Sequence, residues 1–344
     1  MKYRKLGNTD LEVSVICLGT MTWGEQNTEA EGWEQLDYAL DQGVNFIDTA
    51  ELYSTPARAE TYGSTEKIIG NWLAARKNRE KVILGTKIAG PGAYTRHIRE
   101  DKVYSRKSIS DAIALSLERL QTDYIDLYQI HWPERKTNFF GDKSYVHAEG
   151  WEDNMKMRLE VLQEYIDKGI IRYIGISNET PWGLMNYLKL SEQFDLPRVM
   201  SVQNPYNLLN RIYEIGLSEM SIREECGLLA YSPVACGRLT NKYIEGTDTP
   251  DCRLNKFKQY QRYNNPNALL ATQQYYDLAK EEGLSLAQLS LAWVNQQDFV
   301  TSNIIGATNL TQLKENIASI ELTLDDKLVK KINTIHELVP NPSP

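Results

Sequence analysis

Four ionisable residues in the first half of the chain could together donate a proton and stabilise negative charge. Asp48, Lys87 and His131 each end an apolar run typical of a buried strand, and Tyr53 follows Asp48 by five residues. A buried Asp48 needs a cationic or hydrogen-bonding partner. If these strands are parallel neighbours, the four side chains meet at one mouth. Taken singly, Lys87 could equally be a surface lysine, and His131 could equally be a core histidine with satisfied hydrogen bonds. The argument for catalysis is that the four residues share one position at the strand ends.

The elements that must position these residues alternate between apolar runs and helical periodicity. The expected strands are 15–19, 44–48, 82–87, 125–131, 173–177, 199–203, 228–232 and 303–305. Helical patterns between them include 29–42, 65–76, 108–120, 154–168, 181–193 and 212–225. Eight strand–helix units predict an α/β fold, a closed (β/α)8 TIM barrel formed by one domain over residues 1–344. A doubly wound sheet is the alternative, but no GxGxxG follows any of the strands.

Segments outside the repeating units are expected to close the two ends of the barrel. Residues 2–6 and 13–16 read as an N-terminal β-hairpin that covers one end. Long connections at 89–107, 132–154 and 234–267 follow strands and should crowd the C-terminal mouth. The proline-rich tail at 340–344 is expected to be poorly ordered.

Composition excludes several classes of protein. A net charge of -8 and a pI near 5.3 argue against a general nucleic-acid or membrane surface. Cys17, Cys226, Cys236 and Cys252 contain no CxxC pair and are too sparse for a disulfide framework. The N-terminus has no signal-type apolar core, so we expect a cytoplasmic enzyme. We also expect no metal.

Several motifs resemble the aldo-keto reductase superfamily, in the family's order and from about residue 2 to 336. GVNFIDTAELY at 43–53 looks like its first signature, VILGTK at 82–87 like its lysine strand, and LYQIHWP at 127–133 like its histidine strand. GTMTWGEQN at 19–27, IRYIGISNET at 171–180 and QNPYNLLNR at 203–211 are most similar to the bacterial Tas-type NADP(H)-dependent members, which also resemble potassium-channel β subunits. Glu179 departs from the pattern, since many members have an aromatic residue there.

The resemblance implies that Asp48, Tyr53, Lys87 and His131 form a catalytic tetrad for carbonyl reduction. Tyr53 would donate the proton, and the Lys87 ammonium, held by Asp48, would stabilise its phenolate, because a free tyrosine has a pKa of about 10. His131 would hydrogen-bond the substrate oxygen. Trp23 and Trp132 could line the substrate pocket with Tyr53 and His131, with Tyr94 or Phe139 as further candidates, and core or loop packing is the alternative for these aromatic residues. Arg58 and Arg96 give only a weak indication of a carboxylate-bearing carbonyl.

The resemblance also implies an NADP(H) cofactor. Ser177, Asn178 and Gln203 match the residues that hold the nicotinamide amide, and Tyr231 matches the aromatic residue that stacks on its ring. The remaining matched positions, in the strand ends, the pyrophosphate loop and the adenosine site, are Gly19, Thr20, Asp48, Ser232, Pro233, Val234, Gly237, Leu239, Lys242, Arg253, Gly306, Thr308, Gln312, Glu315 and Asn316. Two cations, Lys242 and Arg253, suit a 2′-phosphate better than a bare ribose, which favours NADP(H) over NAD(H).

Two functions of other classes stay open. In the first, the protein binds NADP(H) and reports redox state to a partner, as the similarity to channel β subunits allows. In the second, the barrel is an isomerase or lyase that uses Lys87 as a Schiff base and the helix after Gly306 for a substrate phosphate.

Overall fold

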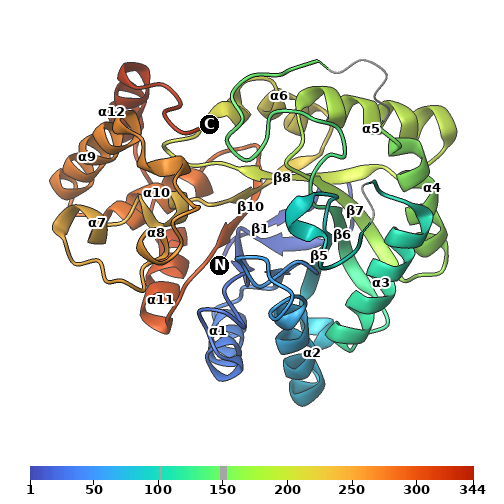
Figure 1. The fold of residues 1–344 in the computed structure, drawn as a ribbon. Helices are drawn as coiled ribbons and strands as arrows, with labels where there is room; N and C mark the ends of the chain where they lie inside the picture. The colour runs from blue at the N-terminus through green and yellow to red at the C-terminus, as the bar shows by residue number, and fades with distance from the viewer. Residues whose placement is uncertain (101–102, 148–152) are drawn as a thin grey trace.

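Eight parallel strands form a closed barrel in the computed structural model, which describes residues 1–100, 103–147 and 153–344 (Figure 1). The barrel order is β10-β3-β4-β5-β6-β7-β8-β9, so the first and last barrel strands of the chain pair and close the sheet. The strands are β3 (Ile16–Gly19), β4 (Phe46–Asp48), β5 (Ile83–Ile88), β6 (Ile125–Ile130), β7 (Ile171–Ser177), β8 (Val199–Pro205), β9 (Gly227–Tyr231) and β10 (Val300–Ile305). The predicted (β/α)8 barrel is confirmed.

The N-terminal hairpin packs against the inward-facing residues at one end of the barrel. Strands β1 (Tyr3–Lys5) and β2 (Glu12–Ser14) pair antiparallel. Leu6, Leu11 and Val13 of this segment are buried in one cluster with inward-facing barrel residues such as Phe46 and Leu127. The hairpin therefore closes the N-terminal end of the barrel, as the sequence predicts, and the polar strand ends are left at the opposite end.

Most of the helices surround the barrel and turn an apolar face to the strands, whereas the short α7 (Lys242–Glu245) and α8 (Arg253–Lys256) do not pack on them in this way (Figure 1). The other helices are α1 (Glu29–Asp41), α2 (Ser64–Arg76), α3 (Arg106–Leu120), α4 (Met155–Asp167), α5 (Pro181–Phe194), α6 (Leu217–Arg223), α9 (Pro266–Glu281), α10 (Leu286–Asn295), α11 (Leu310–Ala318) and α12 (Asp326–Leu338). Capping boxes at Thr28 and Ser285 fix the starts of α1 and α10. Within the described residues, no helix is both long and apolar enough to cross a membrane.

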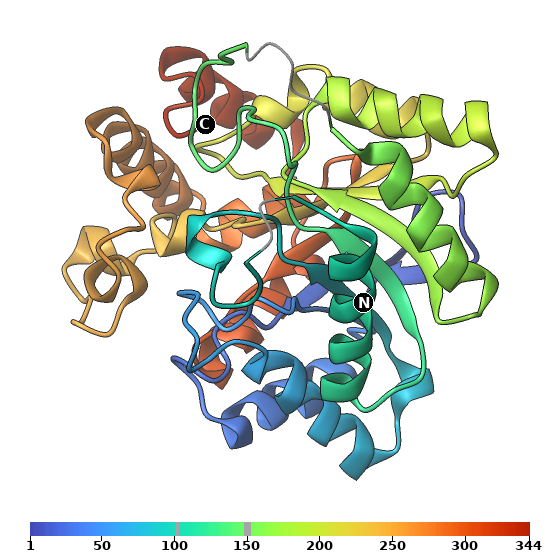
Figure 2. The same ribbon diagram turned by 45° about the vertical axis from the view of Figure 1, so that its right-hand side comes forward.

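The structure differs from the sequence prediction in two helical regions. The helix expected at 212–225 is divided into a 3-10 turn, Ile212–Glu214, and α6, because Gly216 between them has a φ of 94° that a helix cannot contain. The long connection at 234–267 contains the short helices α7 and α8, which project beside the barrel (Figure 2). The other two long connections include residues 101–102 and 148–152, which lie outside the described residues.

The C-terminal tail packs against the barrel mouth, contrary to the disorder expected from its composition. Ser343 is buried, and its backbone N–H donates to the Leu209 carbonyl at 3.0 Å. Asn265, the N-cap of α9, donates to the Pro342 carbonyl at 2.8 Å. The tail contains three prolines, whose fixed φ limits the entropy lost when these few contacts form.

Candidate active site

The polar strand ends open into one cavity of about 1460 Å³ at the C-terminal mouth of the barrel. The strand register explains this convergence, since Gly19, Asp48 and Gly85 are paired across β3, β4 and β5. Ser177 pairs with Gln203 at the corresponding level of β7 and β8. Asp48, Tyr53 and His131 line the cavity, and Lys87 lies buried beneath it.

Asp48 and Lys87 form a buried ion pair. Lys87 Nζ donates to Asp48 Oδ2 and to the Thr49 carbonyl, both at 2.7 Å, and the lysine is fully inaccessible to solvent. The other carboxylate oxygen, Oδ1, accepts from Gln203 Nε2 at 2.8 Å and Gln129 Nε2 at 3.3 Å. With these partners, the pair satisfies the requirement that a buried charge be neutralised and hydrogen-bonded.

The turn after β4 brings Tyr53 back over the strand ends. The Glu51 N–H continues the pairing with β5 by donating to the Lys87 carbonyl at 3.2 Å, and the Tyr53 N–H donates to the Ala50 carbonyl at 3.0 Å. Lys87 Nζ lies 5.1 Å from the centroid of the Tyr53 ring. Burial, followed by the negative charge of Asp48, raises the pKa of Tyr53, while the charge of Arg253 opposes the rise. The Tyr53 hydroxyl is therefore protonated in this environment.

His131 meets Tyr53 edge to face, with 5.8 Å between ring centroids. Burial and the positive charge of Lys87 lower the pKa of His131 well below its usual range, so the imidazole is neutral. Its Nδ1 is buried and has no hydrogen-bond partner among the described residues. A neutral histidine in a cavity can donate from one ring nitrogen to a bound oxygen.

Strands β7 to β9 contribute a connected set of amide and hydroxyl groups to the mouth. Asn178, whose φ of 55° is one that asparagine tolerates, donates from Nδ2 to the His131 carbonyl at 2.8 Å. The Tyr231 hydroxyl donates to Asn178 Oδ1 at 2.7 Å, and the Ser177 hydroxyl donates to the Gln203 carbonyl at 2.7 Å. All five of these residues line the cavity.

The segment after β9 crosses the cavity in a tight turn. Ser232, Ala235, Cys236 and Gly237 all have positive φ values. Lys242 follows this turn and lines the cavity, as do Ser232, Pro233 and Val234. Leu239 does not line it, because its side chain is fully buried in the main apolar core.

The segment after β10 forms the far wall of the cavity. Gly306, Thr308, Gln312, Glu315 and Asn316 all line it. The space above Gly306 is open, with no heavy atom within 4 Å of an added β-carbon. Gln312 Oε1 accepts from the Thr308 N–H at 3.1 Å, and Asn316 Nδ2 donates to the Gly306 carbonyl at 3.1 Å.

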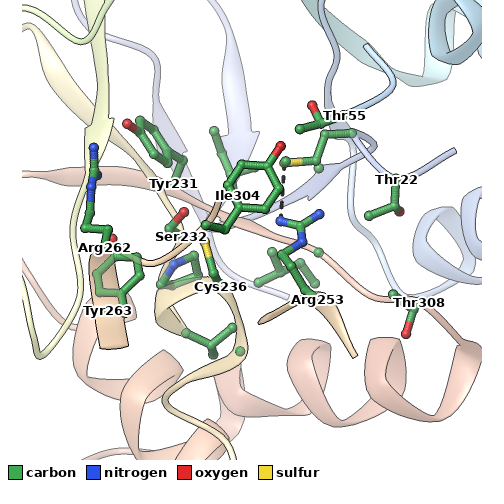
Figure 3. Close-up of a pocket in the computed structure, with 18 of the residues that line it drawn as sticks. Thr22, Thr55, Tyr231, Ser232, Cys236, Arg253, Arg262, Tyr263, Ile304 and Thr308 are labelled. Atoms are coloured by element: carbon green, nitrogen blue, oxygen red, sulfur yellow. Dashed lines mark hydrogen bonds between the residues drawn. The ribbon is translucent and has the colours of Figure 1, made fainter. Parts of the chain in front are cut away.

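Arg253 reaches from α8 into the cavity (Figure 3). Its Nη1 lies 3.8 Å from the Met21 sulfur, and its Cζ lies 5.9 Å from the centroid of the Tyr260 ring. No carboxylate among the described residues pairs with it. The guanidinium is therefore available to an anion in the cavity.

Sequence comparison identifies the protein family. The aldo/keto reductase family model matches residues 15–337. The chain belongs to the aldo/keto reductase family. It is 46% identical to Protein tas of Escherichia coli (strain K12), over the full length of both chains. It is 33% identical to the uncharacterized oxidoreductase YrpG of Bacillus subtilis, covering 97% of this chain and 96% of the relative. A probable voltage-gated potassium channel subunit beta of Arabidopsis thaliana is 29% identical over 94% of this chain and 92% of the relative.

Some residues predicted for the substrate pocket of this aldo/keto reductase lie elsewhere. Trp23 is fully buried in the core beside α1, where it packs against Gly32, so it does not line the cavity. Trp132 and Tyr94 do line it, 5.3 Å apart by ring centroids. Phe140 takes the place expected for Phe139.

The two arginines considered for a substrate carboxylate do not reach the cavity. Arg58 pairs with Glu25, and Arg96 is exposed. Neither lines the cavity within the described part of the chain.

Glu179, the departure from the family pattern, forms a buried ion pair. Arg135 donates to both of its carboxylate oxygens and also pairs with Asp153 at 3.0 Å. Arg135 follows β6 and Glu179 follows β7, so the pair joins the strand ends that carry His131 and Asn178. Burial raises the pKa of Glu179, and Arg135 opposes the rise. The acidic residue therefore has a structural partner in this aldo/keto reductase.

Sequence reasoning missed two contributors to the mouth. Gln129 hydrogen-bonds Asp48, and its position two residues before His131 on a strand was the available signal, because alternate residues share a face. Arg262 lines the cavity from a 3-10 turn, Arg262–Asn264, and no sequence pattern indicates where such a turn lies.

Proposed function

We propose that this protein reduces aldehyde or ketone carbonyls to alcohols and uses NADPH as the cofactor. The observation that supports the proposal best is the arrangement of a buried Asp48–Lys87 ion pair directly beneath a protonated Tyr53, next to a neutral His131. Family membership supports an oxidoreductase, and the residues of the mouth supply the chemistry that a carbonyl reduction requires.

Tyr53 and His131 are proposed to act on the substrate oxygen. As negative charge develops there, the oxygen becomes a stronger base than a phenolate, so proton transfer from the Tyr53 hydroxyl is favourable even though burial raises its pKa. The neutral imidazole of His131 donates a hydrogen bond to the same oxygen and orients the carbonyl. Lys87 places a positive charge near the Tyr53 ring as the phenolate forms, while Asp48 fixes that ammonium in position.

The cavity fits NADPH by size and by charge. Its volume of about 1460 Å³ exceeds the roughly 300–1,000 Å³ of most small-molecule sites, as a dinucleotide and a substrate together require. Two of its lining cations, Lys242 and Arg253, pair with no carboxylate among the described residues. Lys242 and Arg253 would hold phosphates, and Ser177, Asn178 and Gln203 would hold the nicotinamide amide. When bound, NADPH would supply the hydride for the carbonyl carbon.

The two other functions fit the site less well. A Schiff base at Lys87 would need a nucleophilic amine, whereas this ammonium is inaccessible and donates to Asp48 and Thr49. A purely redox-sensing role does not require Tyr53, Lys87 and His131 to be assembled around a cavity.

Transfer of label from the cofactor tests the proposal directly. The purified protein is incubated with NADPH that carries deuterium at both positions on C4 of the nicotinamide, together with a panel of aldehydes and ketones. We expect alcohol products that carry deuterium on the former carbonyl carbon. If the protein binds NADPH but gives no labelled alcohol from any compound, the reductase proposal is contradicted and the sensor role is favoured.

A further inference from the structure

Arg262 is a half-buried cation in the cavity that lacks an acidic partner among the described residues. Its Cζ lies 6.0 Å from the centroid of the Tyr263 ring, and its side chain lies beside Tyr231 and Tyr263 (Figure 3). Burial raises the pKa of Tyr231, and the charge of Arg262 is the largest effect that opposes the rise. Removing a cation from water without a counter-charge is costly, and the neighbouring Tyr231 and Tyr263 hydroxyls carry no charge, so this guanidinium is available to an anionic ligand.

The cofactor leaves Arg262 unaccounted for. The proposed phosphate ligands are Lys242 and Arg253, and Figure 3 shows Arg253 and Thr308 on the opposite side of the cavity from Arg262. Arg262 instead lies beside Tyr231, which hydrogen-bonds Asn178 next to His131. The anion that it faces therefore belongs near the carbonyl end of the cavity.

The connection that follows His131 also packs against Arg262. A β-carbon added at Gly141 would lie 3.4 Å from Arg262 Nε and 3.9 Å from both Arg262 Nη2 and the Pro344 carbonyl oxygen, so this backbone lies beside the guanidinium. Gly141 has a φ of 101°, and it lines the cavity beside Phe140. Phe140 meets Trp132 edge to face at 5.8 Å, which gives the same wall an apolar surface for the body of a substrate.

We propose that Arg262 binds an anionic group of the carbonyl substrate, and that the preferred substrates are aldehydes or ketones bearing a carboxylate. The inference rests on the proposed function, because it names the substrate class of the same site. A guanidinium forms two parallel hydrogen bonds with a carboxylate or phosphate, and the aromatic wall accepts the apolar part of the molecule.

Matched substrates test the inference. The rates with 4-carboxybenzaldehyde are compared with those for its methyl ester, in which one added methyl group removes the charge. A parallel pair, 4-formylphenyl phosphate and 4-methoxybenzaldehyde, separates a phosphate site from a carboxylate site. We expect kcat/KM to favour the carboxylate over its ester. Arg262→Gln should lower kcat/KM for the carboxylate about 10- to 100-fold, mainly through KM, and leave the ester within about twofold.

Two further variants separate recognition from folding. Arg262→Lys keeps the charge but not the paired hydrogen bonds, so it should lose less activity on the carboxylate than Arg262→Gln. Arg223→Gln removes an exposed arginine on α6 that pairs with Glu219, far from the cavity lining, and should match the wild type on both substrates. Equal losses of activity on the acid and the ester in Arg262→Gln would overturn the inference. If the phosphate is preferred over its neutral match but the carboxylate is not preferred over its ester, the assignment of carboxylate substrates is overturned.

Binding without turnover distinguishes failure of the inference from failure of the proposed function. Calorimetry with benzoate and methyl benzoate needs no reduction. If no aldehyde is reduced but benzoate binds the wild type more tightly than Arg262→Gln, the anion site stands and the reductase proposal fails. If the aldehydes are reduced but neither rates nor benzoate binding depend on Arg262, the reductase proposal stands and the anion site is wrong.

Discussion

The Asp48–Lys87 ion pair is the residue-scale feature on which the proposed chemistry depends. Both groups are buried, and their attraction offsets the cost of removing them from water only while both are present. The glutamines that donate to Asp48 hold it in one orientation. The pair should therefore contribute to stability as well as to catalysis.

Removing one charge of this pair should destabilise the fold more than removing both. Lys87→Met leaves Asp48 buried without a counter-charge, so we expect the free energy of unfolding to fall by about 3–5 kcal/mol. The double variant Asp48→Asn/Lys87→Met should recover part of that loss. Urea unfolding of the wild type, the two single variants and the double variant measures the coupling. Strictly additive losses would show that the two groups do not interact in this way.

His131 should make the stability of the protein sensitive to acid. Burial and Lys87 lower its folded-state pKa, so its contribution is present above the unfolded pKa of about 6.5 and is lost as the pH falls toward the folded value. The wild type should lose more unfolding free energy between pH 7 and pH 5 than His131→Gln does. Thermal unfolding across this range gives the comparison, and equal slopes for the two proteins would contradict the assignment.

Lys242 should distinguish NADPH from NADH. Loss of one charge-assisted hydrogen bond to a phosphate costs about 1.5–3 kcal/mol, so Lys242→Ala should weaken NADPH binding about 10- to 100-fold and change NADH binding little. Lys256→Ala is the matched control, since Lys256 pairs with Asp251 and does not line the cavity. Fluorescence titration with each nucleotide measures both affinities. An equal loss for NADPH and NADH would remove Lys242 from the 2′-phosphate site.

At the scale of elements, the strand ends were predictable and the packing between elements was not. The apolar runs identify β4, β5 and β6, and their parallel order brings Asp48, Lys87 and His131 to one end. Trp23 was a candidate for the pocket because it lies near a strand end. No sequence pattern distinguishes an aromatic residue of the core from one of a pocket at such a position. Arg262 was missed because its place depends on a turn and on a contact with Gly141, which is distant in sequence.

The contact between α2 and α3 depends on a glycine that the sequence does not mark as special. A β-carbon at Gly70 would lie 2.1 Å from the Arg119 carbonyl oxygen of α3, so one helix would have to move. Gly70→Ala should lower the free energy of unfolding by at least about 1–3 kcal/mol, although alanine favours helix. Ala75→Gly, at an exposed site on α2, should cost only about 1 kcal/mol. Urea unfolding checks both, and a stabilised Gly70→Ala would show that the helices are not in close contact.

At the scale of the whole molecule, the hairpin closes the N-terminal end of the barrel, and the candidate site occupies the opposite, C-terminal end. The C-terminal mouth collects the proposed acid, the neutral histidine and the unpaired cations in one cavity. The aldo/keto reductase fold and the mouth were predictable from motif order. The packed tail was not, because its order depends on Asn265 and Leu209, which are far from it in sequence.

The measurement that tests the account most directly is NADPH oxidation by wild type and Tyr53→Phe over the same carbonyl substrates. Removing one oxygen removes the proposed proton donor but leaves the ring and the cavity in place. We predict near-complete loss of kcat with NADPH affinity retained, while Tyr173→Phe, which removes a hydroxyl bonded to Asp10 away from the cavity lining, keeps wild-type rates. Full activity in Tyr53→Phe would contradict the account, because another group would then be the acid.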